Sequence, residues 1–289
     1  MTHSRHCLSV LLGLLLLTTL ARGDDFPKLV SQAEQSRCVV LGESHGIVEH
    51  GRFLLRLCSE LHERGGYNYL ALEGCFDRQS YLDRYLEGES PSNELLKATY
   101  LAPNVWPVLE WAREQKLKPS GSKLRVVLID GPSHWNVSKL EQSRDQAMFS
   151  RVKTLLDGDP QARVLVYCGN GHTSKNVLLN DKAAGPRGQL DRFEIPSFTL
   201  AHYLNLWTEG QTLSVRAVDS YDPIFEKLPR KMRSGDPFLL KLSSSPWAEE
   251  RGLLKPGGAI HEAVRGKQAG ELADFLAIFC KLTTRNRFR

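Results

Sequence analysis

Four short apolar runs each lead to an ionisable residue beside a glycine, and this pattern constrains the fold more than any other feature. The runs are residues 38–41, 69–72, 124–129 and 163–168. Runs of four to six apolar residues, rich in β-branched side chains and bounded by glycine, are typical of strands buried on both faces. We therefore predict an α/β fold, with a mainly parallel sheet and helices on both of its faces.

The segments around these runs predict the remaining elements. Helical periodicity predicts helices over residues 47–64, 79–86, 93–100, 105–115 and 137–156. Weaker patterns predict helices over residues 196–207 and 270–282, and strands over residues 212–218 and 238–242. We expect a single α/β domain over residues 24–289, in which the pattern weakens from about residue 180.

The first 23 residues have the pattern of an export signal. Arg5 precedes an apolar run over residues 8–20, and the small residues Ala21 and Gly23 follow it, which predicts cleavage before Asp24. The alternative, a retained membrane anchor, is disfavoured because the run is shorter than the about 20 residues that span a bilayer. We expect an exported protein, periplasmic or secreted, that is not inserted in a membrane after cleavage.

Charge and cysteine content exclude some partners and sites. Removing Arg5 and Arg22 from the 38 Lys and Arg residues leaves 36, against 33 Asp and Glu residues. So small a surplus, without a basic patch in the body of the chain, is not typical of nucleic-acid binding. An odd number of cysteines remains, which leaves room for one disulfide but not for complete pairing, and no spacing is typical of zinc. These are Cys38, Cys58, Cys75, Cys168 and Cys280.

Glu43 and His45 follow the first run and are two residues apart. In extended chain, this spacing points both side chains the same way. A carboxylate beside an imidazole orients the ring and raises its basicity, as in a general base that acts on water, and the same pair can ligate a metal ion. The alternative is local: His45 caps the next helix and Glu43 binds loop amides.

Ionisable residues follow the other three runs as well. Glu73 and His172 stand beside glycines, and we predict that both are functional, since a carboxylate so near the core must be compensated. Asp130 is either functional or binds the amides of its own loop. Asn170 is expected to offer its amide to a developing oxyanion. His50 is a candidate only for supporting the first motif.

Four short motifs, taken in order, resemble one superfamily. It joins erythromycin esterase-like hydrolases to ChaN-like haem-binding uptake proteins and, more distantly, to Tiki-type metalloproteases. The motifs are Leu-Gly-Glu-Ser-His-Gly at 41–46, Leu-Glu-Gly at 72–74, Arg-Asp-Gln-Ala-Met at 144–148 and Gly-Asn-Gly-His at 169–172. The resemblance spans about half of the mature chain. The single residue between Glu43 and His45 is similar to the ChaN-like side, whereas residues 109–114 are similar to the esterase side.

The resemblance implies roles for the residues in these motifs. His45 would be the general base, with Glu43 and Glu73 as its carboxylate partners. His172 would be a second acid or base, and Arg144 would reach a carboxylate or a substrate anion. If the activity depends on a divalent metal, His45, Glu73 and His172 would be its ligands.

Two functions from different classes follow from the two branches. The first is an exported hydrolase that cleaves an ester or related bond in a small-molecule substrate by Glu/His water activation, with or without a metal. The second is a haem- or iron-binding uptake protein, in which a tyrosine is one candidate ligand. In either case, we expect His45, Glu73 and His172 to converge within about 10 Å at the carboxyl ends of the strands.

Overall fold

The computed structural model describes most of the chain beyond the predicted signal peptide. The described ranges are residues 25–98, 104–119, 122–132, 144–175, 178–179, 197–220, 237–245 and 267–280, with single positions or pairs at 222, 225–226, 233, 248–249 and 282. Residues 1–23 lie outside these ranges, so the signal peptide stays a prediction. Within the described part of the chain, no helix is both long enough and apolar enough to span a bilayer.

The six predicted strands form one sheet, together with a seventh strand that the sequence did not predict. Its strands are β1 (Cys38–Glu43), β2 (Tyr69–Cys75), β3 (Arg125–Asp130), β4 (Val164–Gly169), β7 (Thr212–Val218), β8 (Phe238–Lys241) and β9 (Phe275–Ile278). They lie in the order β3-β2-β4-β1-β7-β9-β8, and every neighbouring pair is parallel except β8 with β9. β5 (Leu178–Leu179) and β6 (Ser197–Phe198) form a separate antiparallel pair. The mainly parallel α/β fold is confirmed.

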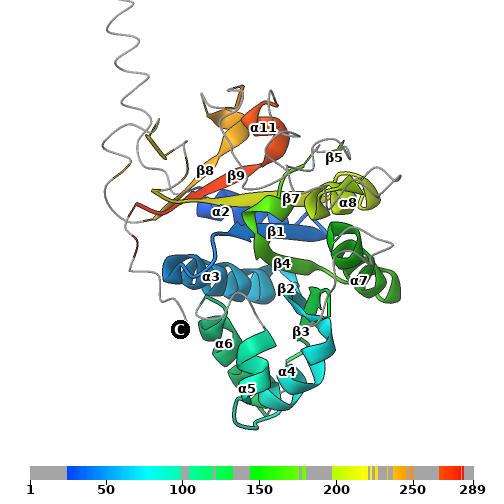
Figure 1. Cartoon of the computed structure of the whole chain (residues 1–289). Helices are drawn as coiled ribbons and strands as arrows, with labels where there is room; N and C mark the ends of the chain where they lie inside the picture. The colour runs from blue at the N-terminus through cyan, green and yellow to red at the C-terminus, as the bar shows by residue number, and fades with distance from the viewer. Residues whose placement is uncertain are drawn as a thin grey trace, which may run out of the picture.

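Helices cover both faces of this sheet, as the apolar strands require. The helices are α2 (Phe26–Ala33), α3 (Val48–Gly65), α4 (Gln79–Leu86), α5 (Asn93–Ala98), α6 (Trp106–Leu117), α7 (Arg144–Gly158), α8 (Leu200–Trp207) and α11 (Ala269–Leu272). Short 3-10 turns lie at η1 (Phe76–Arg78), η3 (Asn170–His172) and η6 (Leu242–Ser244). Figure 1 shows α3 and α6 on one side of the sheet and α7 and α8 on the other.

Alternate side chains of each strand join different cores. Val39 and Leu41 of β1 pack in a core with α2, α3, α4 and α6. Cys38 and Val40, which point to the opposite face, pack in a second core with α7 and α8. Because both faces are covered, all six residues of β1 are buried, which explains its continuous apolar sequence.

Two predictions for the later part of the chain are wrong. Residues 270–282 do not form a closing helix: α11 ends at Leu272, and Phe275–Ile278 form β9, with all four residues buried between β7 and β8. A short apolar run fits both the helical and the strand period, and here the pairing with β7 and β8 selects the strand. Asp274, just before β9, accepts a hydrogen bond from the β7 amide of Ser214 at 2.8 Å.

The helix predicted over residues 196–207 begins later. Ser197 and Phe198 pair with β5, and Thr199 caps α8, so the helix starts at Leu200. Of the helix predicted over residues 137–156, the part before Arg144 lies outside the described residues. The five described cysteines are all free thiols, so none of them forms the disulfide that the sequence allowed.

Gly42 lets the turn after β4 approach β1 closely. A methyl group there would lie 2.4 Å from Asn170 Oδ1 and 2.7 Å from Thr173 Cγ2. We expect Gly42→Ala to lower the free energy of unfolding by about 1–3 kcal/mol, measured by urea denaturation, because the turn must shift. Gly158→Ala is the control: nothing lies within 4 Å of that position, so the change should be neutral or stabilising. Equal effects at both positions would contradict the close approach.

Candidate functional site

The carboxyl ends of the four predicted strands meet at one edge of the sheet. β1 runs parallel to β4 with Glu43 opposite Gly169, and β2 runs parallel to both β4 and β3. This pairing brings the ends of β2 and β3, with Glu73 and Asp130, beside the turn after β4 that carries His172. Open α/β sheets bind their ligands at such an edge.

Glu43 and His45 are in direct contact after β1. Nδ1 of His45 forms an ion-pair contact with Oε1 of Glu43. The Glu43 side chain is fully buried, whereas 54% of the His45 side chain is exposed. The pKa of Glu43 is raised, chiefly by burial, and the pKa of His45 is raised, chiefly by the Glu43 carboxylate against Nδ1. The carboxylate therefore holds a proton on Nδ1, which leaves Nε2 as the reactive nitrogen.

The far side of the His45 ring faces Gly169 and Glu73. A methyl group at Gly169 would lie 3.4 Å from His45 Cε1 and 3.4 Å from Glu73 Oε2, so both side chains approach the same point. No residue in the described ranges makes a hydrogen bond to His45 Nε2. As far as the described residues go, the lone pair of Nε2 is thus available to water or a ligand.

Glu73 is held on both of its oxygens. Oε2 accepts a hydrogen bond from the Gly169 amide at 2.5 Å, and Oε1 accepts one from Arg144 Nη2 at 2.5 Å. Only 1% of the Glu73 side chain is exposed. A carboxylate removed from water to this extent needs such partners, because its desolvation is costly.

Arg144, at the start of α7, bridges β2 and β3. Besides Glu73, it binds both oxygens of Asp130, through Nε at 2.8 Å and Nη2 at 2.5 Å. Burial alone would lower the pKa of Arg144, but Asp130 and Glu73 raise it, so the guanidinium stays charged. Asp130 also accepts from its neighbour Gly131 at 2.7 Å, so it binds its own loop as well as the ion-pair network.

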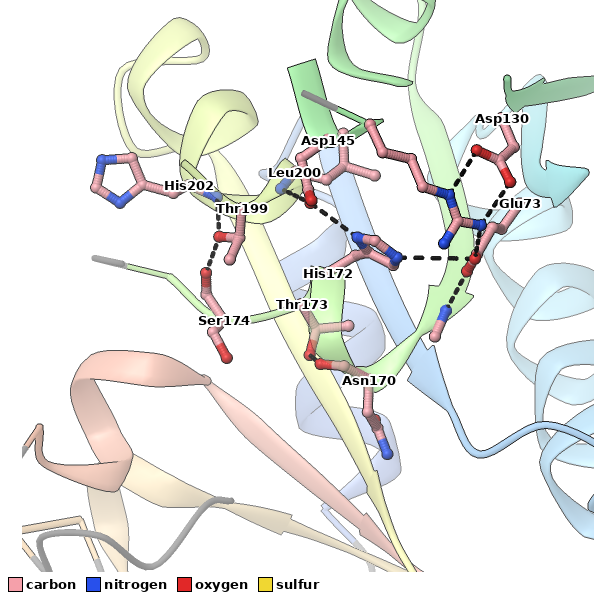
Figure 2. A network of polar contacts seen from close by, with 12 residues as sticks. Glu73, Asp130, Asp145, Asn170, His172, Thr173, Ser174, Thr199, Leu200 and His202 are labelled. Atoms are coloured by element: carbon pink, nitrogen blue, oxygen red, sulfur yellow. Dashed lines mark hydrogen bonds and ion pairs between the residues drawn. The ribbon is translucent and has the colours of Figure 1, made fainter. Parts of the chain in front are cut away.

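His172 lies between Asp145 and Glu73, as Figure 2 shows. Its Nδ1 is 2.8 Å from Asp145 Oδ1, and its Nε2 is 3.7 Å from Glu73 Oε1. Burial alone would lower the pKa of His172, but the charge and hydrogen bond of Asp145 raise it to about 9. The ring is therefore an imidazolium at neutral pH, so it acts as a proton donor or a positive charge rather than a base.

No role was predicted from the sequence for Asp145, which stands there only as part of the motif at 144–148. It is buried, and its Oδ1 also accepts from the Leu200 amide at 2.6 Å, which ties His172 to the start of α8. Its position in the sequence could have identified it, because the first turn of a helix in a parallel α/β fold lies at the carboxyl edge of the sheet.

Asn170 does not serve the role predicted from sequence. Its side chain binds the backbone of β7, donating to Ala217 O at 2.9 Å and accepting from Ala217 N at 3.2 Å. Figure 2 shows it pointing away from Glu73. The prediction of an oxyanion donor at Asn170 is therefore wrong. His50 contacts the first motif, as the sequence allowed: its Nδ1 accepts a hydrogen bond from the Ser44 amide at 3.0 Å.

The six predicted site residues thus lie at one edge, and their catalytic roles stay predictions. They are Glu43, His45, Glu73, Asp130, Arg144 and His172. In the described ranges, no three His, Cys, Asp or Glu side chains are grouped as metal ligands, and the metal site suggested for His45, Glu73 and His172 stays a prediction.

A cavity of about 800 Å³ lies at the opposite edge of the sheet and contains none of these residues. It is lined by residues at the end of α3 and before β2, β3 and β4, including His62, Arg64, Lys123 and Arg163. Arg163 donates to the carbonyl of Gly65 at 2.7 Å, at the carboxyl end of α3. Basic side chains at helix carboxyl ends complement the helix dipole, so we do not connect this cavity with the site.

The raised pKa of His172 makes stability depend on pH. The pKa rises from 6.5 to about 9 on folding, so its contribution is complete below pH 6.5 and is lost as the pH rises through 9. We expect wild type to lose up to about 3 kcal/mol more unfolding free energy than His172→Gln between about pH 6 and pH 10. Urea unfolding measures this difference.

The control is His62→Gln, because the His62 ring contacts the neutral Tyr67 carbonyl and Ser122 hydroxyl. This variant should retain the wild-type pH dependence. A pH dependence in His172→Gln as steep as in wild type would contradict the assignment of a charged His172.

The chain is similar to one protein family and to several solved structures. A family model described as "Haem-binding uptake, Tiki superfamily, ChaN" matches residues 29–129. No protein in the curated collection matches the chain in sequence.

Three solved structures share the fold over nearly their whole length. An erythromycin esterase mutant, EreC, in its open conformation has a TM-score of 0.65 at 14% identity, covering 90% of this chain and 94% of its own. A protein from Bacillus cereus has a TM-score of 0.61 at 16% identity, covering 89% and 91%. A succinoglycan biosynthesis protein has a TM-score of 0.57 at 12% identity, covering 90% and 91%. The family model over residues 29–129 supports the superfamily suspected from the sequence, and the three solved structures show that the α/β fold is shared.

Proposed function

We propose that this protein is an exported hydrolase that cleaves an ester or related bond with a water activated by His45. The observation that carries the proposal is the His45 ring, with Nδ1 against the buried Glu43 carboxylate and Nε2 open beside Glu73 and Gly169. This is the arrangement of an oriented general base. The fold shared with an erythromycin esterase supports the same class of reaction.

In the proposed reaction, His45 Nε2 takes a proton from water while the water oxygen attacks the carbonyl carbon of the ester. Glu43 stabilises the imidazolium that forms. Arg144, 41% exposed, and the charged His172 lie beside Glu73 and would stabilise the oxyanion of the tetrahedral intermediate. The bond to the leaving oxygen then breaks, and that oxygen takes the proton back from the His45 imidazolium, which releases an alcohol and restores the base. The carboxylic acid that forms gives its proton to solvent and leaves as a carboxylate.

A second candidate is haem binding, which the family match favours. Most described tyrosines are poorly placed as ligands: Tyr67, Tyr69, Tyr85 and Tyr167 are buried, and the Tyr67 hydroxyl donates to two backbone carbonyls. Tyr81 and Tyr203 are partly exposed, whereas Tyr100 and Tyr221 lie outside the described residues. The charged edge described above fits water activation better than it fits an apolar macrocycle.

His45→Ala should remove most of the turnover of a 4-nitrophenyl ester that wild type hydrolyses, by about 10²- to 10⁴-fold in kcat. The fold should remain, because more than half of the His45 side chain is exposed. Initial rates with acetyl to decanoyl esters measure the effect, and His62→Ala, at the opposite edge, is the control. Full activity of His45→Ala would exclude this base.

The pH profile should report the Glu43–His45 contact. A base must be neutral, and Glu43 raises the pKa of His45, so kcat/KM should rise with a midpoint above that of a free imidazole. Glu43→Gln removes the largest cause of the raised pKa, so the midpoint should shift to lower pH while the maximal rate falls. If the pH midpoint of Glu43→Gln equals that of wild type, the role of Glu43 is contradicted.

Two reagents, a chelator and haemin, distinguish this proposal from the metal-dependent and haem-binding alternatives. A chelator should leave the turnover unchanged, because the site residues do not form a metal-binding cluster; chelator-sensitive turnover would make His45 a ligand instead. Haemin should give no Soret shift with the purified protein. A stoichiometric Soret band, lost on substitution of Tyr203, would favour the uptake protein.

A further inference from the structure

We propose that Asn104, 61 residues from Glu43 in the chain, is a positioning residue that holds the Glu43 carboxylate in the orientation His45 requires. Asn104 lies just before α6 and is not part of any motif described above. The inference rests on the proposed function, since it assigns a partner to the proposed base. Its structural part, the orientation of the His45 ring, can be measured without any turnover.

The contact joins two fully buried groups. Asn104 Nδ2 donates a hydrogen bond to Glu43 Oε2 at 2.7 Å, while Oε1 of the same carboxylate faces His45. Neither Asn104 nor the Glu43 side chain is exposed. The amide therefore fixes the rotation of the carboxylate: with Oε2 held by Asn104, Oε1 must point at the ring.

Gly51 of α3 allows the backbone of Asn104 to approach the helix closely. A methyl group at Gly51 would lie 1.9 Å from the Asn104 carbonyl oxygen and 2.8 Å from its Cα. The chain before α6 thus packs directly on the backbone of α3. One residue earlier, His50 accepts the Ser44 amide, so the same turn of α3 supports both the carboxylate and the peptide between Glu43 and His45.

Tyr167, in β4, lies beside the Asn104 amide that binds Glu43. Its hydroxyl and Asn104 Oδ1 are both buried, and within the described ranges neither has a hydrogen bond of good geometry. The two side chains are nevertheless neighbours: burial raises the pKa of Tyr167, and the nearby Asn104 amide lowers it in part. The Asn104 amide is therefore confined between a phenol and a carboxylate, with its N–H group directed at Glu43.

Loss of the amide would leave Glu43 Oε2 buried without a donor. A buried carboxylate oxygen without a partner is costly, so the carboxyl group would rotate or admit water to satisfy it. Either change moves Oε1 away from His45 Nδ1. A merely structural Asn104, which only anchors the start of α6, would instead affect stability and leave the ring as it is.

The test uses the whole mature chain with Asn104→Leu, which keeps the volume, and Asn104→Asp, which keeps the shape but replaces the donor with a carboxylate. Long-range ¹H–¹⁵N NMR reads the tautomer of the His45 ring, assigned by comparison with His45→Ala. In wild type, we expect the proton on Nδ1 and a downfield resonance from its hydrogen bond to Glu43. In both Asn104 variants, that resonance should disappear and the two tautomers should mix.

Kinetics with 4-nitrophenyl acetate supply the second readout. We expect kcat to fall by about 10- to 100-fold in both Asn104 variants with KM nearly unchanged, as when the partner that orients a functional histidine is removed. Thr208→Val is the matched control: its buried hydroxyl bonds Leu204 O at 2.8 Å, far from the site. It should lower stability without changing the His45 resonance or kcat.

The outcomes separate the two proposals. If His45 keeps its Nδ1 proton and hydrogen bond in both folded Asn104 variants, the positioning role is wrong, whatever the activity. If the resonance is lost but wild type hydrolyses none of the esters, the positioning role holds and the hydrolase proposal fails. If both Asn104 variants fail to fold, Tyr167→Phe and Gly51→Ala, which disturb the amide from its other sides, must shift the His45 resonance; an unchanged resonance in both overturns the inference.

Discussion

The buried carboxylate of Glu73 is the interaction on which the candidate site depends. Almost no part of the side chain is exposed, so its charge is stable there only if protein groups replace water. The amide of Gly169 and the guanidinium of Arg144 do so, and His172 lies 3.7 Å away. One side chain at the end of β2 therefore fixes the end of β4, the start of α7 and the orientation of the turn that carries His172.

At this edge of the sheet, the acidic side chains are buried and the basic side chains above them are partly exposed. Glu43, Glu73 and Asp130 are buried, whereas 54% of the His45 and 41% of the Arg144 side chain are exposed. A ligand would thus meet an imidazole and a guanidinium, while carboxylates beneath them set tautomer and position. Groups held in this way need little reorganisation when charge develops in a transition state. The two histidines differ for the same reason. His172 is enclosed by carboxylates and is charged, whereas more than half of the His45 side chain is exposed to solvent.

Much of the fold could be predicted because its strands are buried on both faces. Apolar runs ended by glycine located β1 to β4, and parallel pairing then required their charged ends to share one edge. Prediction failed where one short apolar run fits two periods. Residues 275–278 form a strand rather than a helix because β7 and β8 offer open hydrogen-bonding edges, and no local signal reports such an edge.

The sequence by itself determined the α/β class, the strand exits and the six side chains that gather there, since burial and glycine turns leave a local pattern. Only the tertiary structure decided their partners. Asp145 binds His172, Asn104 binds Glu43, and Asn170 turns away to the backbone of β7. A hydrogen bond between residues far apart in the chain depends on how helices and loops pack on the sheet. That packing is a property of the whole core, and no short stretch of sequence encodes it.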